Sequence, residues 1–203
     1  MEYGALDDKF AFQELSRLVN RFGVTKIYET GTYKGWSTLK LIELGLQIET
    51  IEINLNFYNL AKDKLKNFEN VNLHLGDSRI KLPEIISDGE ENSMFFLDAH
   101  WNDLPLLKEL EIIAKFTNNP LIIIHDFFVP YGNKIKSNNG YKIVYDGSGS
   151  KFGYDVYGDV ILNIDYIKNK LDIIYNNEYE YHYTSEIDCV DSGLIYIYPK
   201  NKN

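Results

Sequence analysis

The feature that most constrains the fold is a regular alternation of short β-rich runs with segments of helical periodicity. We expect strands at residues 25–30, 48–53, 71–75, 93–97 and 121–124. Helical segments separate most of these runs, and a chain with this alternation forms a parallel sheet covered by helices on both faces. The run 121–124 is apolar throughout, which is typical of a strand near the centre of such a sheet.

We expect five helices, and in four of them apolar residues recur at helical spacing on one face. The first covers about residues 8–22, the second 36–44 and the last 162–175. The other two are identified by the stripes Phe57, Leu60, Ala61, Leu65 and Phe68, and Leu104, Leu107, Leu110 and Ile113. Two final strands, at 178–183 and 194–198, are joined closely enough to be antiparallel neighbours.

These elements predict an α/β fold with a Rossmann-like, doubly wound, seven-stranded and mostly parallel sheet that has an antiparallel C-terminal strand. We expect residues 1–203 to form a single domain. The segment 127–160 is rich in Gly, Asn, Ser and Tyr and is long for an ordinary connection, so we expect it to be a lid or a substrate-covering loop.

Composition limits the partners. The formal net charge is -9, which argues against extended contact with nucleic acid because such binding neutralises phosphates with Lys and Arg. The longest apolar runs are far too short to span a bilayer. The single cysteine, Cys189, cannot form an internal disulfide, and the acidic N-terminus is unlike a signal peptide. We therefore expect a cytoplasmic protein without nucleic-acid or membrane partners.

The loop after the first strand reads Glu29-Thr30-Gly31-Thr32-Tyr33-Lys34-Gly35-Trp36-Ser37. A glycine at 31 permits a tight turn and lets a ligand approach the backbone, and Gly35 permits close helix packing. Glu52 follows about twenty residues later, at the end of the second strand. An acidic side chain at that point can accept both hydroxyls of a ribose. The two features together predict a nucleotide-like ligand.

This spacing resembles the first motif of class I S-adenosylmethionine-dependent methyltransferases, in the variant found in metal-dependent, catechol-type O-methyltransferases. Glu52-Ile53-Asn54 is similar to their ribose-binding motif, and Gly76-Asp77-Ser78 resembles their adenine loop. The resemblance places Gly31, Tyr33 and Ser37 at the methionine end of the cofactor. It implies a cofactor-binding set of Glu29, Gly31, Thr32, Tyr33, Gly35, Ser37, Glu52, Ile53, Asp77, Ser78 and Asp98.

Acids and histidines follow the fourth and fifth strands, as Asp98, His100, His125 and Asp126. The carboxyl ends of neighbouring parallel strands line one crevice, so we expect these four groups to converge. They could bind a divalent metal or move a proton, or they could merely cap the strand ends and hydrogen-bond one another.

The resemblance also implies a metal site formed by Asp98, His125 and Asp126. Magnesium prefers oxygen ligands, whereas the imidazole of His125 suits zinc, iron or manganese, so Mg²⁺, Mn²⁺, Fe²⁺ and Zn²⁺ all stay candidates. The catalytic lysine of the catechol-type enzymes is missing, and Asn102 stands near its place. We expect His100, His125 and Asp126 to be the catalytic residues, with one of the two histidines accepting the proton of the attacking hydroxyl.

The predicted function is S-adenosylmethionine-dependent transfer of a methyl group to a hydroxyl of a small molecule, with or without a metal. One alternative is a metal-dependent hydroxylase-like relative, in which His125 and Asp126 bind iron. Another is a non-catalytic nucleotide-binding module on the same fold. The first helix and the last strands could offer a homodimer surface, but the sequence does not identify the acceptor or the oligomeric state.

Overall fold

The computed structural model describes residues 4–99, 104–129, 134–137, 140–143, 160, 162–184 and 193–200. Among these residues, no helix is both long enough and apolar enough to traverse a lipid bilayer.

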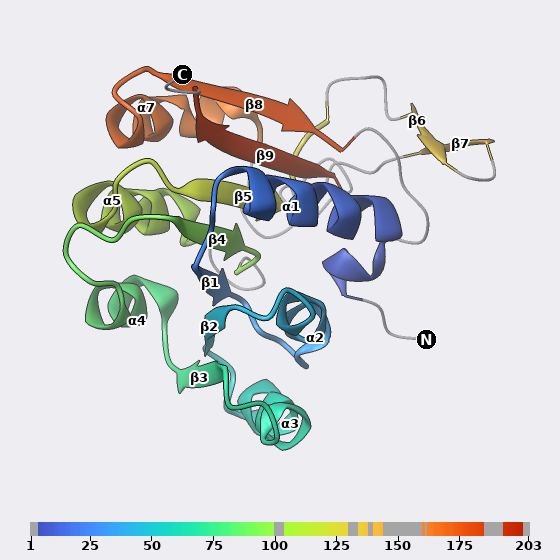
Figure 1. Cartoon of the computed structure of the whole chain (residues 1–203), viewed down its shortest axis with the longest axis vertical. Helices are drawn as coiled ribbons and strands as arrows, with labels where there is room; N and C mark the ends of the chain where they lie inside the picture. The colour runs from blue at the N-terminus through green and yellow to red at the C-terminus, as the bar shows by residue number, and fades with distance from the viewer. Residues whose placement is uncertain are drawn as a thin grey trace.

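The main sheet has seven strands in the order β3-β2-β1-β4-β5-β9-β8 (Figure 1). Its first five strands in the chain all run parallel, and β9 pairs antiparallel with both β5 and β8. The predicted fold, a mostly parallel sheet that ends in an antiparallel C-terminal strand, is confirmed. The strands are β1 (Lys26–Thr30), β2 (Gln47–Glu52), β3 (Val71–Leu75), β4 (Ser93–Leu97), β5 (Leu121–His125), β8 (Tyr179–Tyr183) and β9 (Leu194–Pro199).

Helices connect the strands and cover both faces of the sheet (Figure 1). They are α1 (Lys9–Arg21), α2 (Trp36–Ile42), α3 (Leu55–Leu65), α4 (Ser78–Ile85), α5 (Leu106–Phe116) and α7 (Ile164–Ile174), preceded by a short 3-10 helix, η1 (Ala5–Asp7). A separate antiparallel pair, β6 (Lys134–Ser137) and β7 (Gly140–Ile143), lies within the segment predicted to be a lid. Most of the remaining lid segment lies outside the described residues, so that prediction stays untested.

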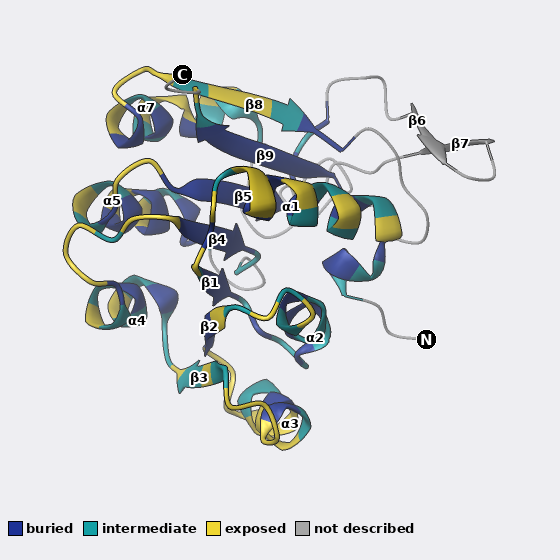
Figure 2. Cartoon of the chain, in the orientation of Figure 1, coloured by how far each residue is buried: buried dark blue, intermediate teal, exposed yellow. Residues whose placement is uncertain are grey.

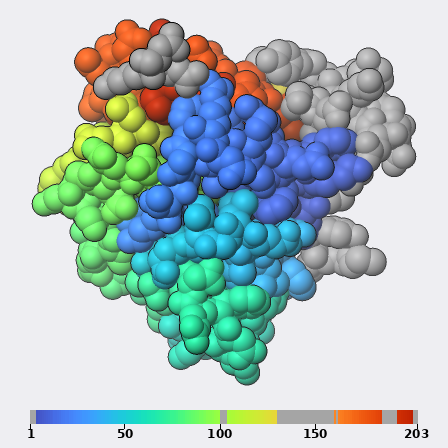
Figure 3. Space-filling model, in the orientation of Figure 1, coloured from blue at the N-terminus to red at the C-terminus, as the bar shows by residue number. Residues whose placement is uncertain are grey.

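The two-residue period of the strands divides the core between the two faces. In β4, Met94 and Phe96 pack with α1 and α2, whereas Phe95 and Leu97 pack with α5 and α7. Because these side chains are all buried, the central strands appear in uniform dark blue (Figure 2). The space-filling view shows the blue N-terminal segment lying directly against the cyan segment that carries α2 and β2 (Figure 3).

The helix stripe predicted for α3 is wrong in detail. In α3 only Ala61 and Leu65 are buried, whereas Leu60 is 52% exposed and Phe68, beyond the helix, is 36% exposed. α3 lies beside the edge strand β3, where less of a helix surface is covered than over the sheet centre. The stripe predicted for α5 does face the core, since Leu110 and Ile113 are buried and Leu104 and Leu107 pack against the same cluster, although Leu104 precedes the helix. The helix α4 was not predicted, since Pro83 lies inside it and its apolar periodicity is weak.

Candidate active site

A cavity of about 280 Å³ opens at the carboxyl edge of the sheet. Residues that directly follow β1, β2, β3 and β4, together with the end of β5, form most of its wall. β1 lies between β2 and β4. The strands that follow β1 in the chain are therefore added first on one side of β1, as β2 and β3, and then on its other side, as β4 and β5. This is the switch point at which open α/β sheets bind ligands. The wall comprises Gly4, Ala5, Gly31, Thr32, Tyr33, Trp36, Ser37, Ile51, Glu52, Ile53, Asn54, Phe57, Gly76, Asp77, Ser78, Arg79, Asp98, Ala99, Pro105, His125 and Asp126.

Glu52 is held at the cavity wall by backbone amides. Its two carboxylate oxygens accept hydrogen bonds from the N–H groups of Tyr33 and Asn54, each at 2.7 Å. Burial raises the pKa of Glu52 above its usual value, although these amide contacts partly offset the effect. A carboxylate that is nearly buried and fixed in orientation is well suited to recognise a polar group of a ligand.

Asp77 lies on the same wall and has two local partners. It caps the N-terminus of α4 by accepting from the N–H of Arg79, and the guanidinium of Arg79 donates to both of its carboxylate oxygens at 2.6–3.1 Å. These contacts hold the pKa of Asp77 below its usual value. Arg79 also lines the cavity, and sequence reasoning missed it because only its position two residues after Asp77 pointed to it.

The loop between β1 and α2 turns through left-handed backbone conformations. Gly31 and Gly35 have φ of 83° and 76°, and Tyr33 has φ of 51°. The Tyr33 ring meets the ring of Phe57 edge-on at 4.4 Å between centroids. A Cβ at Gly35 would meet Leu65 only at an ordinary contact distance of 3.5 Å. Its positive φ, and not the close helix packing that we predicted, therefore explains the glycine.

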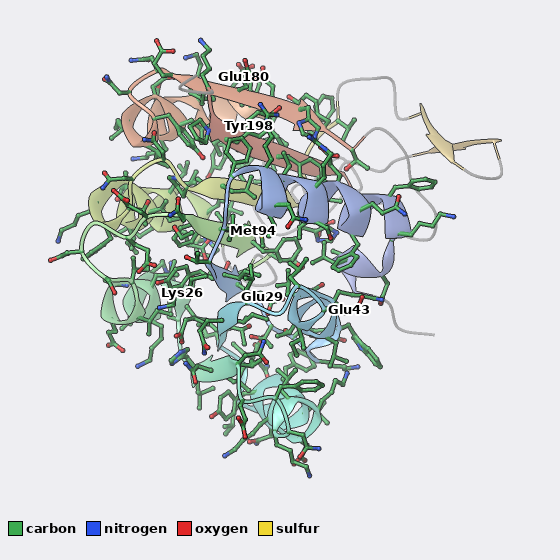
Figure 4. The ribbon with its side chains drawn as sticks, viewed as in Figure 1. Lys26, Glu29, Glu43, Met94, Glu180 and Tyr198 are labelled. Atoms are coloured by element: carbon green, nitrogen blue, oxygen red, sulfur yellow. The ribbon has the colours of Figure 1, made fainter. Side chains whose placement is uncertain are left out.

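Glu29 lies completely buried on β1, near α2 (Figure 4). One of its oxygens, Oε2, accepts from the hydroxyls of Thr38 and Thr50, both at 2.6 Å. Burial raises the pKa of Glu29 to about 7, against the opposing effect of the two hydroxyls. Glu29 is thus part of the support beneath the loop, and its side chain does not reach the cavity wall.

Asp98, His125 and Asp126 converge as predicted. Nδ1 of His125 lies 2.9 Å from Oδ1 of Asp98 and 3.7 Å from Oδ2 of Asp126. One possible ligand atom from each residue lies within 4.8 Å of the other two. Asp126 has φ of 54°, a strained conformation for a residue with a side chain and one that is found often at functional sites.

The charge of His125 follows from its neighbours. Burial of the imidazole opposes protonation, but the nearby carboxylates of Asp126 and Asp98 outweigh it and raise the pKa to about 9. In the absence of a bound metal the ring is therefore protonated at neutral pH, which disfavours the prediction that His125 accepts a proton. His100, the other predicted base, lies outside the described residues.

All but two of the predicted cofactor-binding residues line the cavity. The exceptions are Glu29 and Gly35, which are not part of the cavity wall. We therefore expect them to support the loop after β1 and not to contact a ligand directly. Sequence reasoning missed the contribution of η1, because three residues carry no periodic signal. It also treated Phe57 as a core residue. Asn54 and Gly76, which belong to the two predicted motifs, also line the wall, and its unpredicted residues are Gly4, Ala5, Trp36, Ile51, Phe57, Arg79, Ala99 and Pro105.

The sheet order and the cavity at its switch point define a Rossmann-like α/β protein with a candidate ligand site at the carboxyl edge of the sheet. The family model described as O-methyltransferase matches residues 6–128. The chain therefore belongs to the O-methyltransferase family. No curated protein sequence shows a significant match.

Solved structures share the fold at low sequence identity. A protein assigned as a caffeoyl-CoA O-methyltransferase from Staphylococcus aureus is 20% identical, with a TM-score of 0.61 over 95% of this chain and 84% of that one. An O-methyltransferase from Bacillus cereus in complex with SAH (S-adenosylhomocysteine) is 16% identical, with a TM-score of 0.60 over 98% and 83% of the two chains. The SAH-bound methyltransferase PaMTH1 from Podospora anserina is also 16% identical, with a TM-score of 0.60 over 94% and 78%.

Proposed function

We propose that the protein transfers the methyl group of S-adenosylmethionine to a hydroxyl oxygen of a small molecule. The observation that carries the proposal is a single cavity with Glu52 and Asp77 on one part of its wall and Asp98, His125 and Asp126 on another. The first pair suits the ribose and base of an adenosyl group, and the second set suits the chemistry of a hydroxyl. Family membership and the SAH-bound neighbours support this donor, and favour a transferase over a hydroxylase-like relative.

The cavity wall is suited to a cationic methyl donor. Glu52, Asp98 and Asp126 line it together, and carboxylates stabilise a positive sulfonium in a partly desolvated site. Binding donor and acceptor side by side provides most of the acceleration of such a transfer, because the attacking oxygen, the methyl carbon and the sulfur must be collinear.

In the proposed reaction the acceptor oxygen attacks the methyl carbon. The bond from that carbon to sulfur breaks, and its electron pair remains on sulfur, which gives S-adenosylhomocysteine. We assign the hydroxyl proton to the carboxylate of Asp126, which lines the cavity, since His125 is already protonated at neutral pH without a metal. Asp98 then holds the imidazole through the 2.9 Å hydrogen bond.

The donor set of Asp98, His125 and Asp126 fits a divalent metal. Two carboxylates and one imidazole within 4.8 Å match the ligands that manganese, iron or zinc accept, and the imidazole makes magnesium a poorer fit. A metal held there would lower the pKa of an acceptor hydroxyl. It would also require a neutral His125, so metal binding and protonation of the ring would compete.

The test combines binding with turnover. Isothermal titration should show that S-adenosylmethionine and S-adenosylhomocysteine bind the purified protein, and methyl-labelled donor should pass its label to members of a panel of phenols, catechols and sugars. Asp98→Asn should abolish label transfer, whereas Asp63→Asn on the exposed side of α3 should not change it. If neither compound binds, the proposed function is wrong.

A further inference from the structure

Two threonine hydroxyls connect the buried acid Glu29 to the cavity wall. Thr32 lines the cavity, and its Oγ1 lies 2.5 Å from Oγ1 of Thr50 on β2. Thr50 in turn lies 2.6 Å from Oε2 of Glu29. Thr38, on α2, donates to the same carboxylate oxygen at 2.6 Å but is not part of the cavity wall. These four residues are between 0% and 2% exposed, so water does not compete for their hydrogen bonds.

The direction of the hydrogen bonds that join Thr32, Thr50 and Glu29 follows from counting their protons. A hydroxyl has one proton to donate, and Thr50 gives its proton to Glu29. In the 2.5 Å contact between the two threonines, Thr32 must therefore be the donor and Thr50 the acceptor. The proton of Thr32 points away from the ligand, and only the lone pairs of its oxygen remain for a ligand to use.

This direction belongs to the ionised form of Glu29. Oε2 already accepts from two hydroxyls. The other oxygen, Oε1, is buried and has no hydrogen-bond partner among the described residues. A proton on Oε1 would leave the contacts of Oε2 unchanged, whereas a proton on Oε2 would be donated to one of the two threonine hydroxyls and would reverse that hydrogen bond. Above its pKa of about 7, Glu29 is ionised, and the hydrogen bonds from Thr32 through Thr50 to Glu29 then have a single direction.

We propose that Glu29 and Thr50 are positioning residues that fix the Thr32 hydroxyl as an acceptor, which selects the ammonium group of the methyl donor. The proposal rests on the proposed function, since it requires the amino-acid end of S-adenosylmethionine to lie beside Thr32. An ammonium group can only donate, so an obligate acceptor beside it favours that group and disfavours a ligand with a hydrogen-bond acceptor there.

The test is a comparison of two isosteric substitutions. Thr50→Val breaks the chain between Glu29 and Thr32, and Thr38→Val removes an equally short hydrogen bond to the same oxygen without touching Thr32. The probes are S-adenosylhomocysteine and its analogue in which hydrogen replaces the amino group, titrated calorimetrically at about pH 8, where Glu29 is ionised. Thr50→Val should lower the affinity for S-adenosylhomocysteine about tenfold, which is the change expected for the loss of one hydrogen bond to a charged group. It should change the deaminated analogue less than about twofold.

Thr38→Val should change both dissociation constants less than about twofold, and Thr50→Ser, which retains the hydroxyl, should bind like the wild type. If Thr50→Val does not fold, Thr32→Val removes the cavity end of the same chain and carries the same expected values. If Thr50→Val and Thr38→Val change the two dissociation constants equally, the proposed role of Glu29 and Thr50 is wrong, but the proposed function is unaffected. A wild-type protein that binds no S-adenosylhomocysteine would overturn both the chain and the proposed function.

Discussion

Gly31 lies so close to the backbone of Asp98 that no side chain fits between them. A Cβ at position 31 would lie 2.7 Å from the carbonyl carbon of Asp98 and would overlap its oxygen. The loop that follows β1 and the end of β4 are thereby held in contact, and both belong to the cavity wall. This contact joins the part of the wall that we propose to bind the cofactor to the part formed by Asp98, His125 and Asp126.

Gly31→Ala should therefore destabilise the protein and impair the site. The left-handed φ of 83° and the overlap with Asp98 should together cost about 2–4 kcal/mol. Gly45→Ala is the matched control, since Gly45 has φ of 70° but no atom within 4 Å of the added carbon. It should cost only about 1 kcal/mol. Urea unfolding measures both, and equal losses would contradict the proposed contact.

Glu52→Gln should lower the affinity for S-adenosylhomocysteine by at least about tenfold. Both oxygens of Glu52 accept backbone N–H groups, so an amide nitrogen would place a donor against a donor. Glu49 lies on the same strand but contacts His74 and Asn72, not the cavity. Calorimetry on Glu49→Gln should therefore give the wild-type dissociation constant. A Glu52→Gln variant with unchanged affinity would remove Glu52 from the binding site.

The stability of the metal-free protein should fall as the pH rises from about 6.5 through about 9. The pKa of His125 is raised from 6.5 to about 9 in the folded protein. Protonation of His125 therefore stabilises the fold fully at a pH below 6.5, the pKa in the unfolded chain. This stabilisation is lost as the pH rises through about 9, the pKa in the folded protein. The change should be on the order of 1–3 kcal/mol. Urea unfolding with a chelator present should show a flatter pH dependence for His125→Asn than for the wild type or His74→Asn.

Glu29→Gln should stabilise the protein at pH 8 but not at pH 4.5. Burial raises the pKa of Glu29 from 4.5 to about 7 in the folded protein. The stability that comes from the neutral form of Glu29 is therefore complete at a pH below 4.5, the pKa in the unfolded chain, and is lost as the pH rises through about 7. A glutamine resembles the neutral acid at every pH. The gain at pH 8 should be on the order of 1–3 kcal/mol, and a higher thermal midpoint at both pH values would contradict this explanation.

Mn²⁺ or Zn²⁺ should raise the thermal midpoint of the wild-type protein more than Mg²⁺ does, because the donor set of Asp98, His125 and Asp126 includes an imidazole. A ligand that binds only the folded state stabilises it in proportion to its affinity. Asp126→Asn should reduce the shift, and Asp172→Asn on α7 should retain it. If no divalent ion shifts the midpoint, metal binding has no place in the function.

The sequence was most informative where local chemistry and topology agree. The edge strand β3 and the buried strand β4 were predicted to the residue, since apolar or alternating runs bounded by polar turns specify them locally. The convergence of Asp98 with His125 was also predictable, because neighbouring parallel strands end at one edge.

The remainder depends on tertiary contacts that one sequence does not display. That Glu29 turns away from the ligand follows from Thr38 and Thr50, which lie on two other elements. The protonation of His125 depends on distances between loops. The inclusion of η1 in the cavity wall follows from its packing on α2. None of these relationships leaves a periodic or motif-like signal.

A crystal structure of the protein with S-adenosylhomocysteine tests the central claim most directly. The account predicts that the ligand occupies the cavity at the carboxyl edge of the sheet, with its ribose hydroxyls on the carboxylate of Glu52 and its sulfur on the side of Asp98. A ligand bound elsewhere on the protein, or one whose ribose lies away from Glu52, would contradict it.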